Sequence, residues 1–350
     1  MYSENDLQSA VSAGAISHEA AEALRAHAAG MRSAPVADEE HFRLITGFND
    51  IFVTIAAVLL LVAAAGIGNA ISPGVSGLLV AGAAWLLAEF FTAKRRMALP
   101  SIVLLLSFVG GAAAIPIHIL AENDPNLSEP AASLIFAGVG LFAAFAAWLH
   151  WRRFMVPITV AAGAAGIAAT ALALIMSGWM AATGNTDPEP IILPLVFIAG
   201  LAIFAFAMRW DMTDPSRETR RSDVAFWLHL LAAPMIAHPL FNWLGVSEGE
   251  NIGAASALGV LAIYIGMGLV ALAVDRRALL VSALAYVLIA LSLLFRQFGA
   301  VELNVALTGL VIGSALLALS AFWTPIRSAL VQRLPGPVQS RLPRGALLSV

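Results

Sequence analysis

Two histidines and an asparagine lie in an apolar stretch that contains two prolines. The stretch covers residues 224–244, and its polar residues and prolines are His229, Pro234, His238, Pro239 and Asn242. A proline removes a backbone donor and disturbs the hydrogen bonds of a helix. His238 and Asn242 are four residues apart, so a helix places them on one face. The pattern predicts a broken helix that binds a small solute or an ion. The alternative is a packed proline kink with hydrogen-bonded histidines.

Two further ionisable residues lie inside apolar stretches, where a charge is costly and needs a reason. His118 follows the sequence Ala-Ala-Ile-Pro-Ile, which resembles the region before His238. Either His118 and His238 face one vestibule, or the sequences around them are similar by coincidence. Glu89 lies about one turn from the end of its stretch, near Lys94 and Arg96. It is either held at the membrane interface by these cations or a ligand of a coupling ion.

The sequence predicts no enzyme. It contains no zinc-protease motif, P-loop or dinucleotide fingerprint, and no cysteine. Residues 74–77 resemble the serine motif of rhomboid proteases, and Ala237-His238 resembles their histidine motif. However, these proteases have a glycine three residues after the histidine, where this chain has Phe241. A pair of histidines without nearby carboxylates does not make a metal site. We therefore predict no catalytic residue, cofactor or metal ligand.

The composition places these residues in a membrane. Of the 350 residues, 60% are hydrophobic and 12% are charged, with a mean hydropathy of +0.87, whereas soluble proteins have about 25% charged residues. Only helices and closed barrels satisfy their backbone in lipid, and runs of about twenty apolar residues exceed barrel strands. We predict an all-α polytopic transmembrane helical bundle of about ten spans. The expected spans are 51–68, 74–93, 99–121, 130–149, 154–180, 190–208, 224–244, 252–274, 278–295 and 303–323.

Basic residues mark one side of this bundle. All but Arg296 of the 19 lysines and arginines lie in alternate connections or near the two ends of the chain. Positively charged connections stay in the cytoplasm, so we expect the inner membrane, with both termini cytoplasmic. The cytosolic arginines are expected to contact anionic lipid headgroups.

Paired arginines begin at residues 95, 152, 220 and 276. The recurrence fits tandem two-helix hairpins, each with an arginine pair at its cytosolic turn. It also fits independent selection of positive charge in every inside loop. An inverted repeat of five and five spans is a third interpretation, although no residue correspondence supports it.

The termini are predicted to lie outside the bilayer. Residues 1–30 are predicted to form a cytoplasmic helix–turn–helix head, followed by a linker over 31–47. We expect no signal peptide, because the first apolar run begins near Ile51 behind an acidic segment. The membrane domain covers 48–324. The tail, 325–350, is expected to contain a short interfacial helix.

Three short segments resemble those of a known family. Residues Asp6–Leu24 resemble the N-terminal segment of the DUF2157-type membrane proteins, and Phe48–Val53 and Ala225–Pro234 resemble uncharacterised alphaproteobacterial relatives. The resemblance implies a bacterial multi-pass membrane protein. It implies no activity and no catalytic residues.

We predict an integral inner-membrane protein that binds or transports a small solute or an ion through a broken seventh span. Its candidate ligand residues are His238, Asn242, His229, His118 and Glu89. The alternative is a membrane scaffold or sensor whose head and 209–223 loop contact protein partners. The lipid bilayer is the expected medium, a homo-oligomer is compatible with either function, and no nucleic acid partner is expected.

Overall fold

The computed structural model describes residues 4–31, 48–123, 128–215, 217, 219–245, 254–297, 304–339 and 341–343. Every regular element in these residues is a helix. The chain divides into two compact units, Met1–Phe42 and Arg43–Val350. The first contains α1 (Glu4–Ser12) and α2 (His18–Met31), between which Leu7 and Ala21 are buried.

A glycine follows the end of α1, and a serine caps the start of α2. Gly14 adopts a φ of +71° just after α1, a conformation that glycine tolerates best. Ser17 precedes α2, and its Oγ accepts a hydrogen bond of 3.1 Å from the backbone N–H of Ala20. This bond satisfies one of the free amides at the start of the helix.

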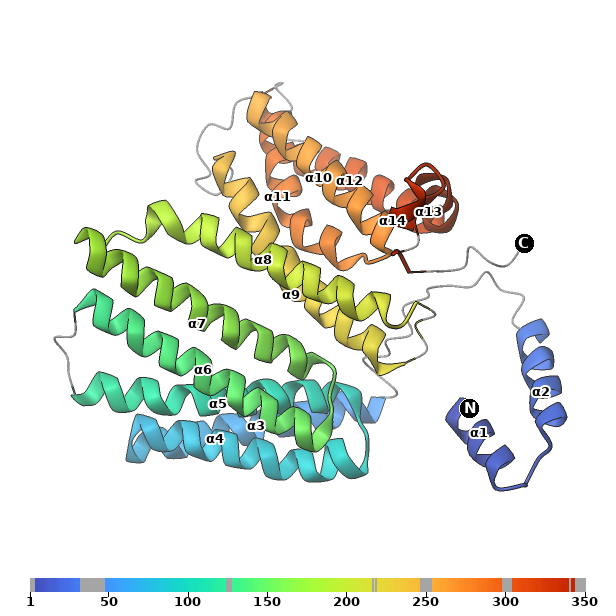
Figure 1. Ribbon diagram of the computed structural model, residues 1–350, viewed down its shortest axis with the longest axis horizontal. Coiled ribbons are helices and arrows are strands. Elements are labelled where there is room, and N and C mark those ends of the chain that lie inside the picture. The colour runs from blue at the N-terminus through green and yellow to red at the C-terminus, as the bar shows by residue number, and fades with distance from the viewer. Residues whose placement is uncertain are drawn as a thin grey trace. The chain divides into compact units, whose positions relative to one another are not determined.

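The second unit is a bundle of long helices (Figure 1). Their bounds are α3 (Phe48–Ile71), α4 (Pro73–Ala88), the π-helix η1 (Glu89–Lys94), α5 (Ala98–Asn123), α6 (Glu129–Phe154), α7 (Ile158–Thr183), α8 (Glu189–Met212), α9 (Arg220–Trp243), α10 (Ala254–Val274), α11 (Ala278–Gln297), α12 (Asn304–Ala321), α13 (Trp323–Val331) and α14 (Gly336–Gln339). The predicted all-helical fold is confirmed for the described residues.

Eight of these helices are long and apolar enough to cross a membrane, counting α4 with η1 as one. They correspond to the first eight predicted spans. The helices α12 and α13 qualify only as a pair that is bent by 72°, and the apolar part of α11, Leu279–Ser292, is shorter. The chain is therefore compatible with a multi-pass membrane protein, and the count of ten spans stays a prediction.

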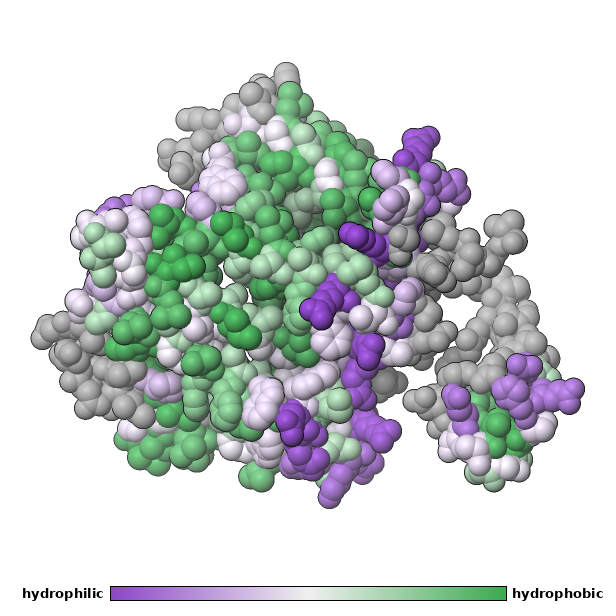
Figure 2. Space-filling model, viewed as in Figure 1, coloured by the Kyte–Doolittle hydropathy of each residue, from purple (hydrophilic) through white to green (hydrophobic). Residues whose placement is uncertain are grey.

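The surface of the bundle is apolar over most of its length. Figure 2 shows hydrophobic residues across the helices and hydrophilic ones gathered toward the right edge of the bundle. On α3, for example, Phe52 is 65% exposed and Leu59 is 66% exposed. A water-soluble protein rarely exposes contiguous apolar surface on this scale, whereas lipid tails are a suitable environment for it.

Helices that a basic connection joins pack against each other. The pairs α4–α5, α6–α7 and α8–α9 pack extensively, and α10 also packs on α11. Each of the four connections contains one non-glycine residue with a positive φ: Arg96 (53°), Met155 (52°), Arg217 (56°) and Asp275 (60°). We call the end of the bundle that holds these connections the basic end (Figure 1).

Glycines bring the paired helices into backbone contact. A Cβ atom on Gly140 of α6 would lie 2.9 Å from the carbonyl oxygen of Gly166 on α7, and one on Gly166 would lie 2.8 Å from that of Gly140. Gly77 of α4 and Gly111 of α5 have the same reciprocal relation. Small residues permit this approach, and close van der Waals packing then holds helices together in lipid.

The expected break in the seventh span is not present. Helix α9 continues from Arg220 to Trp243 through Pro234 and Pro239. Half of its apolar window is buried, because α7, α8 and α11 pack around it. Packing of this kind compensates for the hydrogen bonds that proline removes. The sharp bend lies instead at Phe322, between α12 and α13.

Candidate functional site

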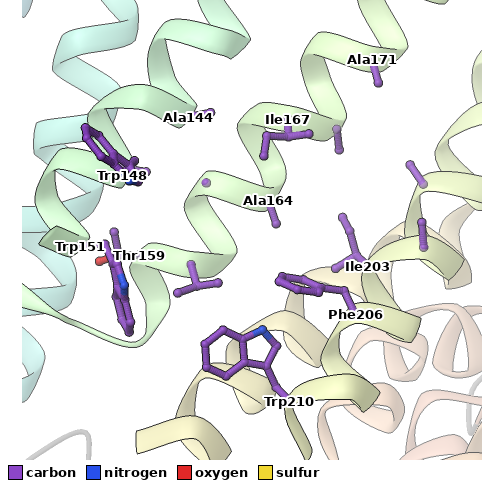
Figure 3. A pocket seen from close by; sticks show the side chains of 16 residues that line it. Ala144, Trp148, Trp151, Thr159, Ala164, Ile167, Ala171, Ile203, Phe206 and Trp210 are labelled. Atoms are coloured by element: carbon purple, nitrogen blue, oxygen red, sulfur yellow. The ribbon is translucent and has the colours of Figure 1, made fainter.

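An apolar groove lies between α6, α7 and α8 (Figure 3). Its volume is about 580 Å³, within the range of about 300–1,000 Å³ that small-molecule sites have. Helix α7 contributes small side chains such as Ala164 and Ala168, whereas α6 contributes Trp148 and α8 contributes Phe206. The groove therefore arises because large rings flank a helix surface of alanines.

Three tryptophans lie at the end of the groove that faces the basic end of the bundle. Trp148 and Trp151 come from the last turns of α6, and Trp210 comes from the last turn of α8. The groove is open along its side, since the lining residues Ile167 and Phe206 are 62% and 40% exposed. A ligand could therefore enter it laterally from the surroundings of the bundle.

Among the described residues that line the groove, Thr159 is the one with a hydroxyl group. Its Oγ1 lies 3.3 Å from Nδ1 of His150, a fully buried residue of α6. The His150 ring in turn packs on Phe154, with ring centroids 4.6 Å apart. Because the hydroxyl already has this partner, the groove offers an apolar wall to a ligand.

A buried ion-pair network fixes the end of α8 beside the groove. Asp211 follows the groove residue Trp210, and its Oδ1 accepts a hydrogen bond of 2.5 Å from Nη2 of Arg276. Nε2 of His229 lies 2.9 Å from the other carboxylate oxygen, and Arg276 also donates to the backbone carbonyl and hydroxyl of Ser222. All of these side chains are buried. The network ties α8, α9 and the α10–α11 connection together.

A second network surrounds Asp275 in the same connection. Its carboxylate accepts hydrogen bonds from Nη1 of Arg217 at 2.8 Å and from Nε1 of Trp323 at 2.6 Å, and Nε of Arg327 lies 3.6 Å away. Burial lowers the pKa of Arg217, and the nearby Arg276 lowers it further, while Asp275 opposes the shift. The guanidinium nevertheless remains a cation in a protein.

These networks bear on the arginines that the sequence predicts to be cytosolic and in contact with lipid headgroups. Arg217, Arg276 and Arg327 are buried against carboxylates, so they are not on the surface where lipid headgroups would lie. Arg152 and Arg209 are exposed. The difference arises because Asp211, in the last turn of α8, and Asp275, in the α10–α11 connection, pair with these arginines across different elements and draw them inward.

The predicted ligand residues of α9 occupy different surroundings. His229 belongs to the buried Asp211 network, and its Nδ1 has no hydrogen-bond partner among the described residues. His238 is exposed, with Nδ1 lying 2.6 Å from the hydroxyl of Tyr286 on α11. Asn242 is half-buried one turn further along. The structure does not join His229 to the other two.

His118 and Glu89 lie on other parts of the bundle. His118 is half-buried on α5, which packs against α3, α4, α6 and α7, whereas α9 packs against α7, α8 and α11. The structure therefore does not place His118 and His238 on one packed pair of helices. Glu89 binds Arg153 of α6, with bonds of 2.9 and 2.5 Å, rather than the neighbouring cations of its own chain segment.

Sequence reasoning did not identify the groove or the buried acids. The stretches that form the groove differ little in composition from other spans, since alanine is common throughout. Asp211 and Asp275 did carry a signal, because each is an acidic residue at the basic end of a span, directly beside tryptophan or arginine. In the described part of the chain, no three His, Cys, Asp or Glu side chains could hold a metal ion together.

Comparison of the chain with family models, with curated proteins and with solved structures finds no match. The function proposed below therefore depends on the geometry of this chain.

Proposed function

We propose that this chain is an integral membrane protein that binds a hydrophobic or amphipathic small molecule in the groove between α6, α7 and α8. The observation that carries the proposal is the open apolar volume of about 580 Å³ between these helices. Water in such a groove would leave its hydrogen bonds unmade, which is unfavourable. Hydrocarbon from a ligand or a lipid has no such cost.

The basic residues at one end of the bundle support a particular orientation of the protein in the membrane. Loops rich in lysine and arginine remain on the cytoplasmic side, so the proposal places the basic end and both termini in the cytoplasm, with α11 and α12 as the ninth and tenth spans of an inner-membrane protein. The resemblance of residues 6–24 to the DUF2157-type proteins is in keeping with this arrangement, and membership of that family stays a prediction.

The groove favours binding of an apolar ligand over passage of a polar one. Its described lining is alanine, other apolar residues and tryptophan, with the Thr159 hydroxyl engaged by His150. Transport of a solute past His238 and Asn242 stays a separate prediction, as does a scaffold or sensor role for the head and the 209–223 loop. Neither requires the groove.

Filling the groove tests the proposal. Ala164 of α7 lines the groove, whereas Ala169 of the same helix is exposed and does not. We expect Ala164→Phe to remove a lipid-like ligand that co-purifies with the protein, as counted by native mass spectrometry, and Ala169→Phe to retain it. If both variants retain the same ligands as the unmodified chain, the groove is not the binding site.

A further inference from the structure

We infer that the groove holds one acyl chain of an anionic glycerophospholipid from the leaflet at the basic end, and that Arg152 and Arg209 bind its phosphate. This inference deepens the proposed function and rests on it. It assigns both the chemical class of the ligand and the residues that select it.

The length of the groove agrees with one leaflet. Its lining on α7 runs from Thr159 to Ala171, which is about 18 Å of helix at 1.5 Å per residue. On α8 the lining runs from Ala199 to Trp210, about 17 Å by the same rise. Half of a hydrocarbon core of about 30 Å is about 15 Å. A groove of this length, starting at the basic end, matches an acyl chain that reaches from the headgroup region to the middle of the bilayer.

The tryptophans mark the headgroup end of the groove. Tryptophan is enriched at the membrane–water interface, where its ring is apolar and its N–H is polar. Trp148, Trp151 and Trp210 all lie at the same end of the groove, while the far end is lined by small residues such as Ala171 and Ala199 (Figure 3). A lipid in the groove would thus have its headgroup among the tryptophans.

Two exposed arginines flank this end. The guanidinium of Arg152 stacks 5.3 Å from the ring centroid of Trp148, and Arg209 immediately precedes Trp210. Within the described part of the chain, neither arginine forms an ion pair or a hydrogen bond through its side chain. This distinguishes them from Arg153, which binds Glu89, and from the buried Arg276. Two unpaired guanidinium groups beside an apolar groove complement a phosphate that is attached to an acyl chain.

The test compares two lipids that differ in the headgroup alone. The purified full-length protein in detergent is titrated with dioleoyl phosphatidylglycerol or dioleoyl phosphatidylcholine, and bound lipid is counted by native mass spectrometry. Two basic residues near an anionic headgroup together favour its binding by about 30-fold. We expect the unmodified protein to prefer phosphatidylglycerol by about this factor, less at high salt because the charges are then screened.

The double variant Arg152→Gln/Arg209→Gln should lose this preference, because it should weaken binding of phosphatidylglycerol more than binding of phosphatidylcholine, whose choline already neutralises the phosphate. The matched control Lys94→Gln/Arg95→Gln removes two exposed cations from the same end of the bundle, away from the groove lining, and should keep the preference. Equal binding of the two lipids by the unmodified protein overturns the inference, as does an equal loss in the control. Competition by glycerol phosphate alone would identify a soluble phosphate as the ligand and would also overturn it.

The groove-filling variant separates this inference from the proposed function. Ala164→Phe should weaken binding of both lipids, whatever the headgroup. If it weakens both but the unmodified protein shows no preference, the groove binds hydrocarbon and only the role of the arginines is wrong. If Ala164→Phe leaves both unchanged, the proposed function itself is wrong.

Discussion

Asp211 and Glu89 each bind an arginine, yet burial gives the two pairs different roles. Asp211 and Arg276 have side chains that are 0% and 2% exposed, whereas Glu89 and Arg153 are 34% and 51% exposed. Removal of one partner from a buried pair leaves an uncompensated charge. The same change at the surface exposes a charge that water solvates, and surface pairs contribute little.

We expect Asp211→Ala to lower the free energy of unfolding by about 3–5 kcal/mol, because Arg276 loses its buried counter-ion. Thermal unfolding in detergent measures the effect, and Glu189→Ala, an exposed acid at the other end of α8, is the control. Adding Arg276→Met to Asp211→Ala should recover part of the loss, since the unpaired charge is then removed as well. A loss no larger than that of Glu189→Ala would contradict a structural role for the pair.

We expect Glu89→Gln to change the free energy of unfolding by less than about 1 kcal/mol, because its ion pair with Arg153 is partly solvated. The same unfolding measurement checks this value. A larger loss would show that the pair is shielded from solvent in the membrane.

At the scale of helices, the sequence predicted where the helices lie along the chain well, and where they break or bend poorly. The long apolar runs located α3 to α10, because a run of about twenty apolar residues in lipid has little alternative to a helix. Two prolines suggested a break in α9, but the packing of three helices around it keeps it continuous. The bend at Phe322 did carry a signal, because Pro325 lies in the first turn of α13 and lacks the backbone N–H that a continuous helix from α12 would need.

The hairpin interpretation of the arginine pairs agrees with the packing but not with a residue-by-residue repeat. Helices joined at the basic end pack closely. However, the residue with positive φ is the second arginine in the first hairpin, Arg96, and precedes the arginine pair in the fourth, Asp275. The four turns therefore solve the same geometric problem at different sequence positions.

We expect Gly140→Val to destabilise the α6–α7 pair by about 1–3 kcal/mol, the usual cost of overpacking. The added Cβ would lie 2.7 Å from Oγ1 of Thr170 and 2.9 Å from the backbone oxygen of Gly166, which cannot move aside freely. Gly138→Val on the same helix is the control, because no atom lies within 4 Å of its Cβ position. Thermal unfolding of the two variants in detergent should differ clearly, and equal values would show that the helices do not need this approach.

For the whole molecule, the amino-acid composition predicted a lipid environment. The distribution of basic residues along the chain predicted the orientation in the membrane. Neither determines which polar groups face inward. The sequence drew attention to α9, and His229 does lie in a buried network, but its partner Asp211 is 18 residues away in another helix. The groove needed three helices in contact, and no pattern within one helix encodes such a space.

The orientation predicts which sites a membrane-impermeant maleimide reaches in intact spheroplasts. The chain has no cysteine, so single cysteines report without background. We expect Asn185→Cys, in the exposed α7–α8 connection, to be labelled, and Thr213→Cys, exposed at the basic end, to be labelled only after the membrane is opened. The reverse pattern would place the basic end outside and contradict cytoplasmic termini.

The bend at Phe322 determines when, during synthesis of the chain, Asp275 gains its partners. It brings Trp323 and Arg327 to Asp275, and the carbonyl of Pro343 accepts a hydrogen bond of 2.7 Å from Arg327. A ribosome delivers these residues only after α10, α11 and α12, so the acid between α10 and α11 gains its full set of partners only once α13 has been made. Synthesis of α13 therefore completes this buried charge pairing, and a product that stops before α13 would retain Asp275 with Arg217 but without Trp323 and Arg327.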